Sequence, residues 1–411
     1  MPKIMILGGG NCQLSAAIRC RELGISTVLI DYTAQPPAAA YADCHEQIST
    51  FDATACIAAA RRHRIDGVLT LGTDQPVYTA ALVADALGLP APLPPQTAYA
   101  VTNKQQMKAI FDTAGIPSAP HRFLQRGATA AELAGLRPPF VIKPVDSQGQ
   151  RGIALLPTAA DVLAHIDTTL SFSRSDSVLV EEYYPNAELT ISGWVQNGQL
   201  HLLSVTDRLS HHLPPSIGVC YGHRCPSRHI AHYMEIEALS RRITTAFEIQ
   251  EGPVYYQLLL GSEGLIVNEV AARIGGAFED IFIPAVSGFA ILDALIWQSL
   301  GTAPDLQGLV GYSPQQPHGA AGVLLLFCRS GRIRSITPLA ELLALPGVVA
   351  AGYQYQAGDL VPEIRDATAR IGHCVILAAD GAELDARVAA FWQHFSIRNP
   401  AGEELALPCS L

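Results

Sequence analysis

Residues 139–153 read PFVIKPVDSQGQRGI, and this stretch decides how the middle of the chain is interpreted. An apolar strand carries Lys143 near its end, a polar loop with Gly149 and Gly152 follows, and the chain returns to an apolar strand. Glycines let backbone N–H groups approach phosphate oxygens closely, and a lysine beside them adds a compact positive charge. The stretch indicates a phosphate loop between two strands, although an ordinary hairpin with a lysine on its rim accounts for it equally well in isolation.

Composition narrows the class of protein. The chain has 411 residues, of which 49% are hydrophobic and 16% charged, so two or three well-buried domains are expected. The net charge of −10 argues against a nucleic-acid partner, which requires a basic face. No apolar run reaches the length of a membrane span, and the first apolar segment is too short for a signal peptide. Nine scattered cysteines are then expected to be reduced thiols in a cytoplasmic protein.

Lysine is rare in this chain. It occurs only at positions 3, 104, 108 and 143, and the other 23 of the 27 basic residues are arginine. A lysine ammonium can reach a phosphate in a way that arginine does not freely replace, so Lys104 and Lys143 are candidate phosphate ligands. Lys3 and Lys108 are interpreted as surface positions.

The first hundred residues alternate between strand and helix patterns. Strands are expected at 3–8, 27–31 and 67–71, and helices at about 15–23 and 53–63. This alternation predicts a doubly wound α/β domain with a parallel sheet, ending in the Pro-rich residues 90–95. The glycine turn at 8–10 lacks the G-x-G-x-x-G spacing of a dinucleotide site. Asp74 ends a strand, where it is either a ligand of the substrate or interdomain cleft or a helix N-cap.

The remaining chain mixes strands and helices. Helices are expected at 102–114, where Thr102 or Asn103 is the N-cap and Gly115 the stop, and at 233–249 and 288–300. Two strand-rich stretches cover 139–156 and 177–206. Residues 318–411 are interpreted as a small α+β cap.

A hairpin between residues 254 and 271 has the features of a metal site. If residues 262–264 form a three-residue loop, Gln257 lies opposite Glu269 on one face. Two oxygen ligands on adjacent strands suit Mg²⁺, and Arg273 is placed to pair with an anion at the same mouth. A buried Glu269–Arg273 ion pair with a structural role is the slightly stronger alternative for the hairpin alone.

Four segments together resemble the ATP-grasp superfamily, in the group of amino-acid ligases and related carboxylate–amine ligases. They are Asn103-Lys104, residues 141–144 with the glycine loop, residues 180–183, and residues 268–276. The resemblance runs from about residue 3 to 301 in the family's order. It implies an α/β domain at 1–100, an ATP-grasp domain at 101–312 with a flexible lid at about 117–187, and a C-terminal α+β domain at 313–411.

The resemblance also implies roles for individual positions. The ATP ligands it implies are Lys104, Lys143, the lid residues Ser147, Gln148, Gly149 and Gly152, the adenine hinge of Glu181 with the backbone of Glu182 and Tyr183, and Glu188 on the ribose. The metal ligands it implies are Gln257 and Glu269, for Mg²⁺, with Mn²⁺ also compatible. Arg273, with Lys143, is the implied catalytic residue, and the substrate side is formed by Arg273, Gly275, Gly276, His223 and Asp74.

The chain departs from the family pattern at the metal hairpin. Many members have Glu where Gln257 stands, although carbamoyl phosphate synthetases are similar in using Gln. Many also have Asn where Ala271 stands, so a second metal ion is expected to bind weakly. Asn268 precedes Glu269, as in carboxyaminoimidazole ribonucleotide synthetases, and can compensate.

The resemblance implies an ATP-dependent ligase that activates a carboxylate as an acyl phosphate and couples it to an amine. The alternatives are an ATP-grasp carboxylase that activates bicarbonate and an ATP-binding protein without turnover. Small-molecule carboxylate and amine substrates are expected, and a homodimer is compatible with the sequence. A zinc knuckle at Cys220 and Cys225 is disfavoured, because only three soft ligands are present, and His211 and His212 are interpreted as solvated residues of a polar loop.

Overall fold

The computed structural model describes all residues from 1 to 411, and its N-terminal part is a parallel sheet, as predicted. Three of its four strands are short apolar runs that are largely buried, which is the pattern of strands between helical layers, and the half-buried edge strand Cys44–Glu46 is the exception. They occur in the order β3-β2-β1-β4, with every neighbouring pair parallel. The elements are β1 (Lys3–Leu7), α1 (Asn11–Glu22), β2 (Ser26–Ile30), β3 (Cys44–Glu46), α2 (Ala53–His63), β4 (Gly67–Leu69), α3 (Gln75–Leu87) and α4 (Pro95–Ala100).

Helix α1 begins four residues earlier than the expected start at Ser15. Its N-cap is Gly10, so the helix follows the glycine turn directly. The N-terminal end of α1 therefore faces the carboxyl edge of the sheet, where ligands collect in α/β folds. Cys12 in its first turn reaches the C-terminal half of the molecule.

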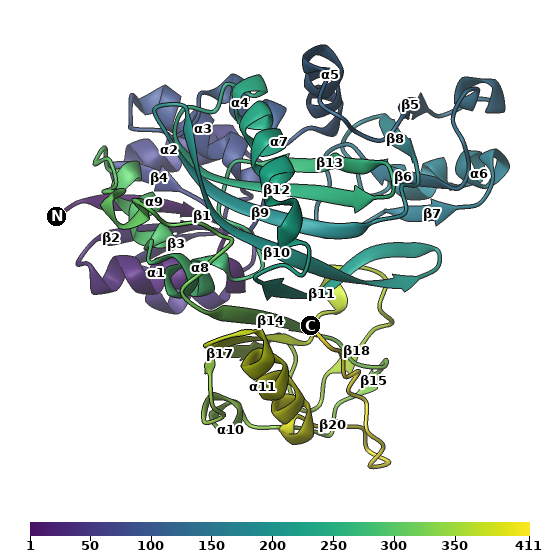
Figure 1. Ribbon diagram of the computed structural model, residues 1–411. Helices are drawn as coiled ribbons and strands as arrows, with labels where there is room; N and C mark the ends of the chain where they lie inside the picture. Colours follow the sequence, from purple (N-terminus) through teal and green to yellow (C-terminus); the bar gives the residue numbers. More distant parts are fainter.

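A second, antiparallel sheet forms the predicted lid region and lies apart from the first sheet at the upper right of Figure 1. Its strand order is β5-β8-β6-β7, and helix α6 packs against it. Helix α5 leads into this region, with Asn103 accepting hydrogen bonds from Gln105 and Gln106 and Gly115 ending the helix at φ 62°, as predicted. The elements are α5 (Lys104–Ala114), β5 (His121–Gln125), β6 (Phe140–Pro144), β7 (Ala154–Leu156), α6 (Ala159–Leu170) and β8 (Ser177–Glu182).

The third sheet has eight strands and crosses from the middle of the chain into its C-terminal part. Its order is β13-β12-β9-β10-β11-β14-β19-β17, and β11 pairs with β14. The C-terminal residues therefore extend the central sheet, with α11 packed on β14 and β19 (Figure 1). The strands are β9 (Ala187–Gln196), β10 (Gln199–Leu213), β11 (Ser216–Cys225), β12 (Gly252–Gly261), β13 (Gly264–Ala271), β14 (Ala320–Leu326), β17 (Val348–Tyr353) and β19 (Gly372–Ala378).

The remaining elements are short or cover the sheets. Two small ladders pair β15 with β18 and β16 with β20. The helices are α7 (Tyr233–Ala246), α8 (Glu279–Ser287), α9 (Ile291–Ser299), α10 (Leu339–Leu343) and α11 (Gly381–His394), and the short strands are β15 (Gly331–Arg332), β16 (Ser335–Ile336), β18 (Leu360–Val361) and β20 (Ile397–Arg398). The 3₁₀ turns are η1 (Pro37–Tyr41), η2 (Ala130–Leu133), η3 (Ile230–His232), η4 (Gln307–Leu309) and η5 (Ala367–Ala369).

The metal hairpin reaches the predicted register by a different route. Gln257 lies opposite Glu269, as predicted, but the loop has two residues, Ser262 and Glu263, instead of three. A register shift after Gln257 adds one residue to β13, because Leu258 pairs with Val267. Such a bulge leaves one residue of the longer strand without a partner opposite it, and here that residue is Asn268.

Two expected helices are shorter than predicted, and α8 is one of the helices that were missed. The helix expected at 233–249 ends at Ala246, and the one expected at 288–300 spans only Ile291–Ser299. Helix α8 precedes it and was not expected, because two glycines lead into it, Phe278 before it has φ 60°, and Pro284 lies within it. Helical patterns with such residues are weak in sequence.

Helix α9 joins the first sheet to the central one. It packs on β4, and Arg19 of α1 forms a two-pronged ion pair with Asp293 at 2.7 and 2.8 Å. Gly67 at the start of β4 lies so close to Ser299 that a Cβ there would be 2.3 Å from the Ser299 carbonyl oxygen. The close packing fixes how the N-terminal sheet meets the rest of the molecule.

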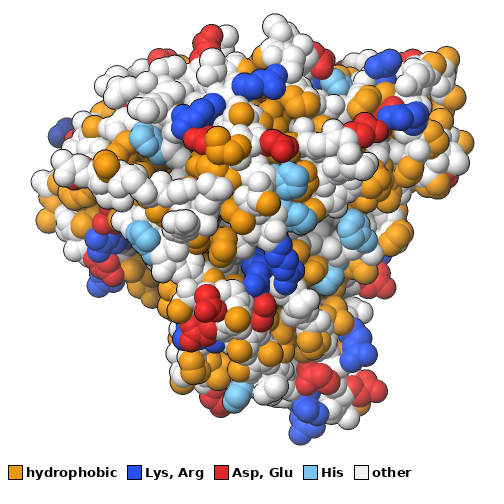
Figure 2. All heavy atoms as spheres, viewed as in Figure 1, with side chains coloured by type: hydrophobic (Ala, Val, Ile, Leu, Met, Phe, Trp, Pro, Cys, Tyr) orange, Lys and Arg blue, Asp and Glu red, His pale blue; other side chains and the backbone are white.

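The surface carries both signs of charge. Acidic and basic side chains lie beside one another over the face in Figure 2 rather than in one continuous basic area. No single helix combines the length and hydrophobicity of a membrane span; α8 and α9 do so only together, with a 114° bend between them.

The Gly67 contact gives a test of the interface with α9. Gly67→Ala is expected to lower the free energy of unfolding by about 1–3 kcal/mol, because the added methyl overpacks the contact with Ser299. Gly308→Ala is the control, because the nearest atom to its new Cβ would be 3.9 Å away. Urea unfolding of both variants measures the difference, and equal stabilities would show that the β4–α9 contact tolerates a side chain.

Candidate functional site

A cavity of about 330 Å³ lies where the three sheets and the C-terminal part meet. Its wall contains the predicted loop residues Ser147, Gln148 and Gly149, both predicted phosphate lysines, and the hairpin residues Gln257 and Glu269. The structure therefore brings the sequence-predicted residues into one place. Gly275 is not in the wall, and Gly152 is represented there by its neighbours Arg151 and Ile153.

One buried carboxylate holds two lysines. The Glu181 Oε1 atom lies 2.5 Å from Lys108 Nζ, and Oε2 lies 2.5 Å from Lys143 Nζ. Burial by itself raises the pKa of Glu181, but the two ammonium groups outweigh it and lower that pKa to about 2. Lys108 is buried, so its interpretation as a surface residue is wrong, and the Glu181 side chain is engaged by lysines.

A second ion pair, between Lys104 and Glu269, joins helix α5 to the hairpin. Lys104 Nζ lies 2.9 Å from Glu269 Oε1 and donates to the Ser147 carbonyl at 3.2 Å. Burial opposes ionisation of Glu269, yet the Lys104 ammonium holds the pKa of Glu269 below its usual range. The Glu269 carboxylate in turn raises the pKa of Lys104, so both groups are charged.

The bulge at Asn268 connects the two lysine pairs. Lys143 Nζ donates to Asn268 Oδ1 at 2.8 Å, and Asn268 Nδ2 donates to Gln257 Oε1 at 3.2 Å. Gln257, Asn268 and Glu269 thus place two amide oxygens and one carboxylate beside the lysines. This donor set fits Mg²⁺, which prefers oxygen ligands and retains several waters.

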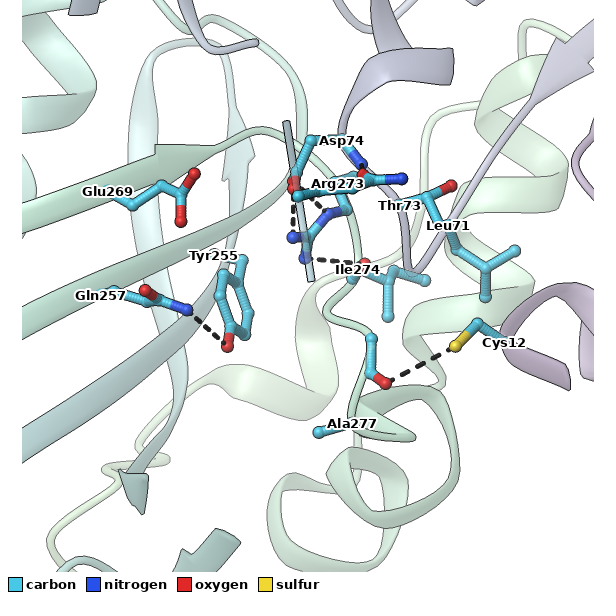
Figure 3. Close-up of polar contacts among 12 residues, drawn as sticks. Cys12, Leu71, Thr73, Asp74, Tyr255, Gln257, Glu269, Arg273, Ile274 and Ala277 are labelled. Carbon is cyan, nitrogen blue, oxygen red and sulfur yellow. Dashed lines mark hydrogen bonds and ion pairs between the residues drawn. The ribbon is translucent and has the colours of Figure 1, made fainter. Parts of the chain in front are cut away.

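Arg273 lies at the opposite side of the hairpin mouth and pairs with the N-terminal domain (Figure 3). Its Nη2 lies 2.5 Å from Asp74 Oδ1, Nε donates to the same oxygen at 2.8 Å, and the guanidinium lies 4.6 Å from the Tyr255 ring centre. The alternative of a Glu269–Arg273 ion pair is therefore not realised. Asp74 occupies the N-cap position of α3 without capping it, because its carboxylate turns to Arg273.

The glycine turn after Arg273 permits two close approaches. A Cβ on Gly276 would lie 2.6 Å from the Gly72 carbonyl oxygen, and one on Gly275 would lie 2.2 Å from a Glu279 carboxyl oxygen. Cys12 donates from Sγ to the Gly276 carbonyl at 3.5 Å (Figure 3). Gly276 thus brings the N-terminal sheet against the cavity, and Gly275 makes room for a buried carboxyl group.

The loop over the cavity contacts all three parts of the molecule. Gln148 Oε1 accepts from the Asp74 amide at 2.7 Å, and the Gly149 carbonyl accepts from the Ala367 amide at 3.2 Å. Gly152 has φ 72°, and a Cβ there would lie 2.8 Å from the Phe172 ring. The loop is closed in this structure by contacts with the N-terminal and C-terminal parts.

At the predicted adenine hinge, which follows the end of β8, the backbone groups that are free to bind a ligand differ from those expected. The amides of Glu182 and Tyr183 donate to the carbonyls of Pro120 and Pro139, at 3.0 and 2.9 Å. The Tyr183 carbonyl and the Tyr184 amide have no hydrogen-bond partner in the protein, and both residues line the cavity. The free polar edge of the hinge therefore lies one residue further along the chain than predicted.

Two further predicted residues lie on strands of the central sheet. Glu188 on β9 pairs with Arg208 on β10, and Arg208 also donates to the Gly218 carbonyl at 3.0 Å. His223 on β11 is buried against Cys220, with 3.4 Å between Nε2 and Sγ, and burial lowers its pKa to about 3. His223 is therefore a neutral imidazole in the cavity wall.

The segments with Cys220–Cys225 and His211–His212 are strands, not loops. Cys220 and Cys225 are both buried in β11, which leaves no open knuckle for zinc. His211 on β10 lies 4.7 Å from the ring of Tyr221, centre to centre, so its interpretation as a solvated loop residue is wrong, while His212 is exposed.

Cys12, Arg208, Tyr255 and Arg370 are among the cavity residues that were missed from the sequence. For Arg208 a signal exists, because Asn197-Gly198 adopts φ values of 52° and 72°, the type I′ hairpin turn that this dipeptide favours. Counting back from that turn places Arg208 opposite Glu188 once one bulge is allowed. Arg370 has no such signal, because it reaches the cavity from the far end of the chain.

Comparison with known proteins identifies similar chains. The family described as L-amino acid ligase C-terminal domain 2 matches residues 323–399. The L-arginine-specific L-amino acid ligase of Bacillus subtilis is 24% identical over 318 residues, 74% of each chain, and dapdiamide A synthase of Enterobacter agglomerans is 22% identical over 61% of this chain and 60% of the relative. The crystal structure of L-amino acid ligase from Bacillus licheniformis superposes with a TM-score of 0.81 at 20% identity, covering 97% of this chain and 99% of that one.

Glu279 gives a pH-dependent test of how this site is built. Burial raises its pKa to about 7, and one of its oxygens has no hydrogen-bond partner. A carboxyl group with a raised folded-state pKa is protonated in both states below about pH 4.5, so it contributes nothing there. As the pH rises to about 7, the folded state loses stability, and the loss then stays constant at about 3 kcal/mol for a shift of this size.

Glu279→Gln removes this titration and keeps the shape. The stability advantage of the variant over the wild type is expected to grow as the pH rises from 5 to 8, because only the wild type must then bury a charge. Urea unfolding at the two pH values measures the gain. A stability difference that is the same at both would show that Glu279 does not titrate in this range.

Proposed function

Because the chain belongs to the ATP-grasp superfamily of carboxylate–amine ligases, we propose that it activates the carboxylate of one amino acid with ATP and joins it to the amine of a second. The observation that carries this proposal is one cavity that gathers Lys104, Lys143, Glu269 and Arg273. These residues supply the charges that phosphoryl transfer to a carboxylate requires.

The nucleotide base fits the end of the cavity formed by the hinge. The Tyr183 carbonyl accepts the exocyclic amine of adenine, and the Tyr184 amide donates to a ring nitrogen, because these two backbone groups are free. Glu188 lies in the same wall and is assigned to the ribose hydroxyls, with Arg208 fixing its carboxylate. The hinge thus supports nucleotide binding without using the Glu181 side chain.

The phosphates fit beside the two lysines and under the glycine loop. Lys143 is held by Glu181 and Asn268, and Lys104 by Glu269, so each ammonium is positioned before ATP arrives. The amides around Gly149 add donors to the phosphate oxygens. Glu269, Gln257 and Asn268 are the residues that would hold Mg²⁺, which neutralises charge on the phosphates when bound.

The reaction has two steps. A carboxylate oxygen of the first amino acid attacks the γ-phosphorus of ATP, the bond to the bridging oxygen breaks, and ADP leaves. The amine of the second amino acid then attacks the carbonyl carbon of the acyl phosphate, the carbon–oxygen bond breaks, and phosphate leaves with formation of an amide. Arg273 lies at the mouth with Asp74 behind it, where its guanidinium stabilises the negative charge of the transferred phosphoryl group.

The activities for which the relatives are named support amino acids as substrates. One is an L-arginine-specific L-amino acid ligase and another a dapdiamide A synthase. Carboxylate-dependent ADP release over a panel of amino acids, with bicarbonate as one member, tests the proposal, and ADP release with bicarbonate alone would favour a carboxylase.

Glu269→Gln tests the metal hairpin. The change keeps the side-chain shape and removes the only carboxylate of the set, so ADP release is expected to fall by orders of magnitude, with a higher Mg²⁺ requirement. Glu263→Gln, in the exposed turn of the same hairpin, is the control and is expected to leave turnover unchanged. A large drop in melting temperature with unchanged Mg²⁺ dependence would show that Glu269 has only a structural role.

Lys143→Ala tests the phosphate assignment. A hydrogen bond to a charged group contributes roughly 1.5–3 kcal/mol, so the affinity for ATP is expected to fall about tenfold or more. Lys3→Ala is the control, because Lys3 donates to the His63 carbonyl outside the cavity. Calorimetric titration with ATP measures both, and equal affinities for the two variants and the wild type would remove Lys143 from the site.

A further inference from the structure

Four of the six lysines and arginines in the cavity wall have a carboxylate partner. Lys143 pairs with Glu181, Lys104 with Glu269, Arg208 with Glu188 and Arg273 with Asp74. Arg151 lies exposed on the loop and donates to a backbone carbonyl. Arg370 alone lies partly buried in the wall with no ion pair and no hydrogen bond from its guanidinium, and its Nε is shielded from solvent.

The backbone around Arg370 is fixed from both sides. The Ala367 amide donates to the Gly149 carbonyl of the loop at 3.2 Å, and the Ile371 amide donates to the Leu326 carbonyl of β14 at 2.8 Å. Asp366, the nearest carboxylate in sequence, accepts hydrogen bonds from the amide and hydroxyl of Thr368 at 2.8 and 2.6 Å. It caps the η5 turn and is therefore not the partner of Arg370.

Arg370 shares the cavity wall with three groups that carry no negative charge, Cys12, Cys220 and His223. Its positive charge contributes to the shifted pKa values of Cys12, Cys220, His223 and His373. Burial first, and then Arg370, lowers the pKa of His373 to about 4, and that ring stacks on Phe278 with centres 3.8 Å apart. In contrast, Glu181 and Glu269 are contacted by Lys108, Lys143 and Lys104.

An arginine left without a partner in such a wall is suited to an anion from outside the protein. Its planar fork matches a carboxylate with two parallel hydrogen bonds. In the proposed reaction the carboxylate of the first amino acid is consumed beside Arg273 and the lysines. The carboxylate of the second amino acid is not consumed and needs a cation of its own.

We propose that Arg370 binds the carboxylate of the amine substrate, so that the acceptor is an α-amino acid rather than a simple amine or an amino-acid amide. This inference rests on the proposed ligase function and deepens it on the acceptor side. Arg370 acts by positioning: two hydrogen bonds to the carboxylate hold the neighbouring amine toward the acyl phosphate. The wall of Cys12, Cys220 and neutral His223 adds no competing charge.

The test separates the acceptor from the donor reaction. Hydroxylamine, which has no carboxylate, traps an acyl phosphate as a hydroxamate and reports the donor step alone. L-Alanine and L-alaninamide, followed by the other amino-acid and amide pairs, report the acceptor step. The wild type is expected to couple the acid with a KM at least tenfold below that of the amide, given the strength of charge-assisted hydrogen bonds.

Arg370→Met removes the charge and keeps a long apolar stem. It is expected to raise the KM for L-alanine roughly 10- to 100-fold, to equalise acid and amide, and to leave hydroxamate formation and the donor KM unchanged. Arg370→Lys is expected to restore part of the preference. Arg365→Met is the matched control, because Arg365 lies exposed five residues earlier and pairs with Glu363.

Three results would overturn the inference: a wild type that accepts the amide as readily as the acid, an Arg370→Met variant that retains the preference, or a variant that loses hydroxamate formation. A wild type that forms no hydroxamate with any carboxylate would refute the proposed function instead. In that case a binding measurement tests the role of Arg370 separately. L-Alanine should raise the melting temperature of the wild type more than that of Arg370→Met, whereas L-alaninamide should shift both equally, and equal shifts with L-alanine would exclude the role.

Discussion

The Glu181 carboxylate, shared between two buried ammonium groups, is the interaction on which the nucleotide end of the molecule depends. It joins Lys108 of α5 to Lys143 of β6 from near the end of β8, and so ties a helix and two strands together at one point. Removing one partner from a buried ion pair costs about 3–5 kcal/mol, because it leaves the other charge without compensation. The cluster therefore fixes Lys143 in direction and leaves the hinge backbone, rather than the Glu181 side chain, to meet a ligand.

The same principle extends along the cavity. Lys104, Arg208 and Arg273 are each neutralised by a carboxylate from a different element, which keeps a strongly charged wall from repelling itself. An incoming phosphate has to compete with these carboxylates for the lysine and arginine side chains. Lys104 has a partner that is a proposed metal ligand, so a metal ion that takes Glu269 would free the ammonium for phosphate. The charged side chains can thus exchange their partners in the protein for a bound metal ion or phosphate with little rearrangement of the fold.

The parts of the site that could be predicted are those that local sequence patterns encode. The capped helix α5, the parallel first sheet and the opposition of Gln257 and Glu269 all follow from turn, cap and periodicity signals. The hairpin register was predicted for the wrong reason, since a shorter loop and a bulge compensate one another. Lys108 was misread because a lysine on a helix gives no sign of burial unless the opposing Glu181 is known, and that contact spans two elements with no fixed spacing in sequence.

The substrate end could not be predicted because no single segment builds it. Asp74 comes from the N-cap position of α3, Arg273 from the turn after β13, and Arg370 from the segment between η5 and β19 in the C-terminal part. The nucleotide end, in contrast, is formed almost wholly by residues between Lys104 and Arg273, where the four motifs lie. The four motifs therefore predict the residues that we propose to activate the carboxylate. The choice of substrate depends instead on how the N-terminal and C-terminal parts pack against the central part. The family match at residues 323–399 includes Arg370 and the whole segment between β14 and β19 that positions it.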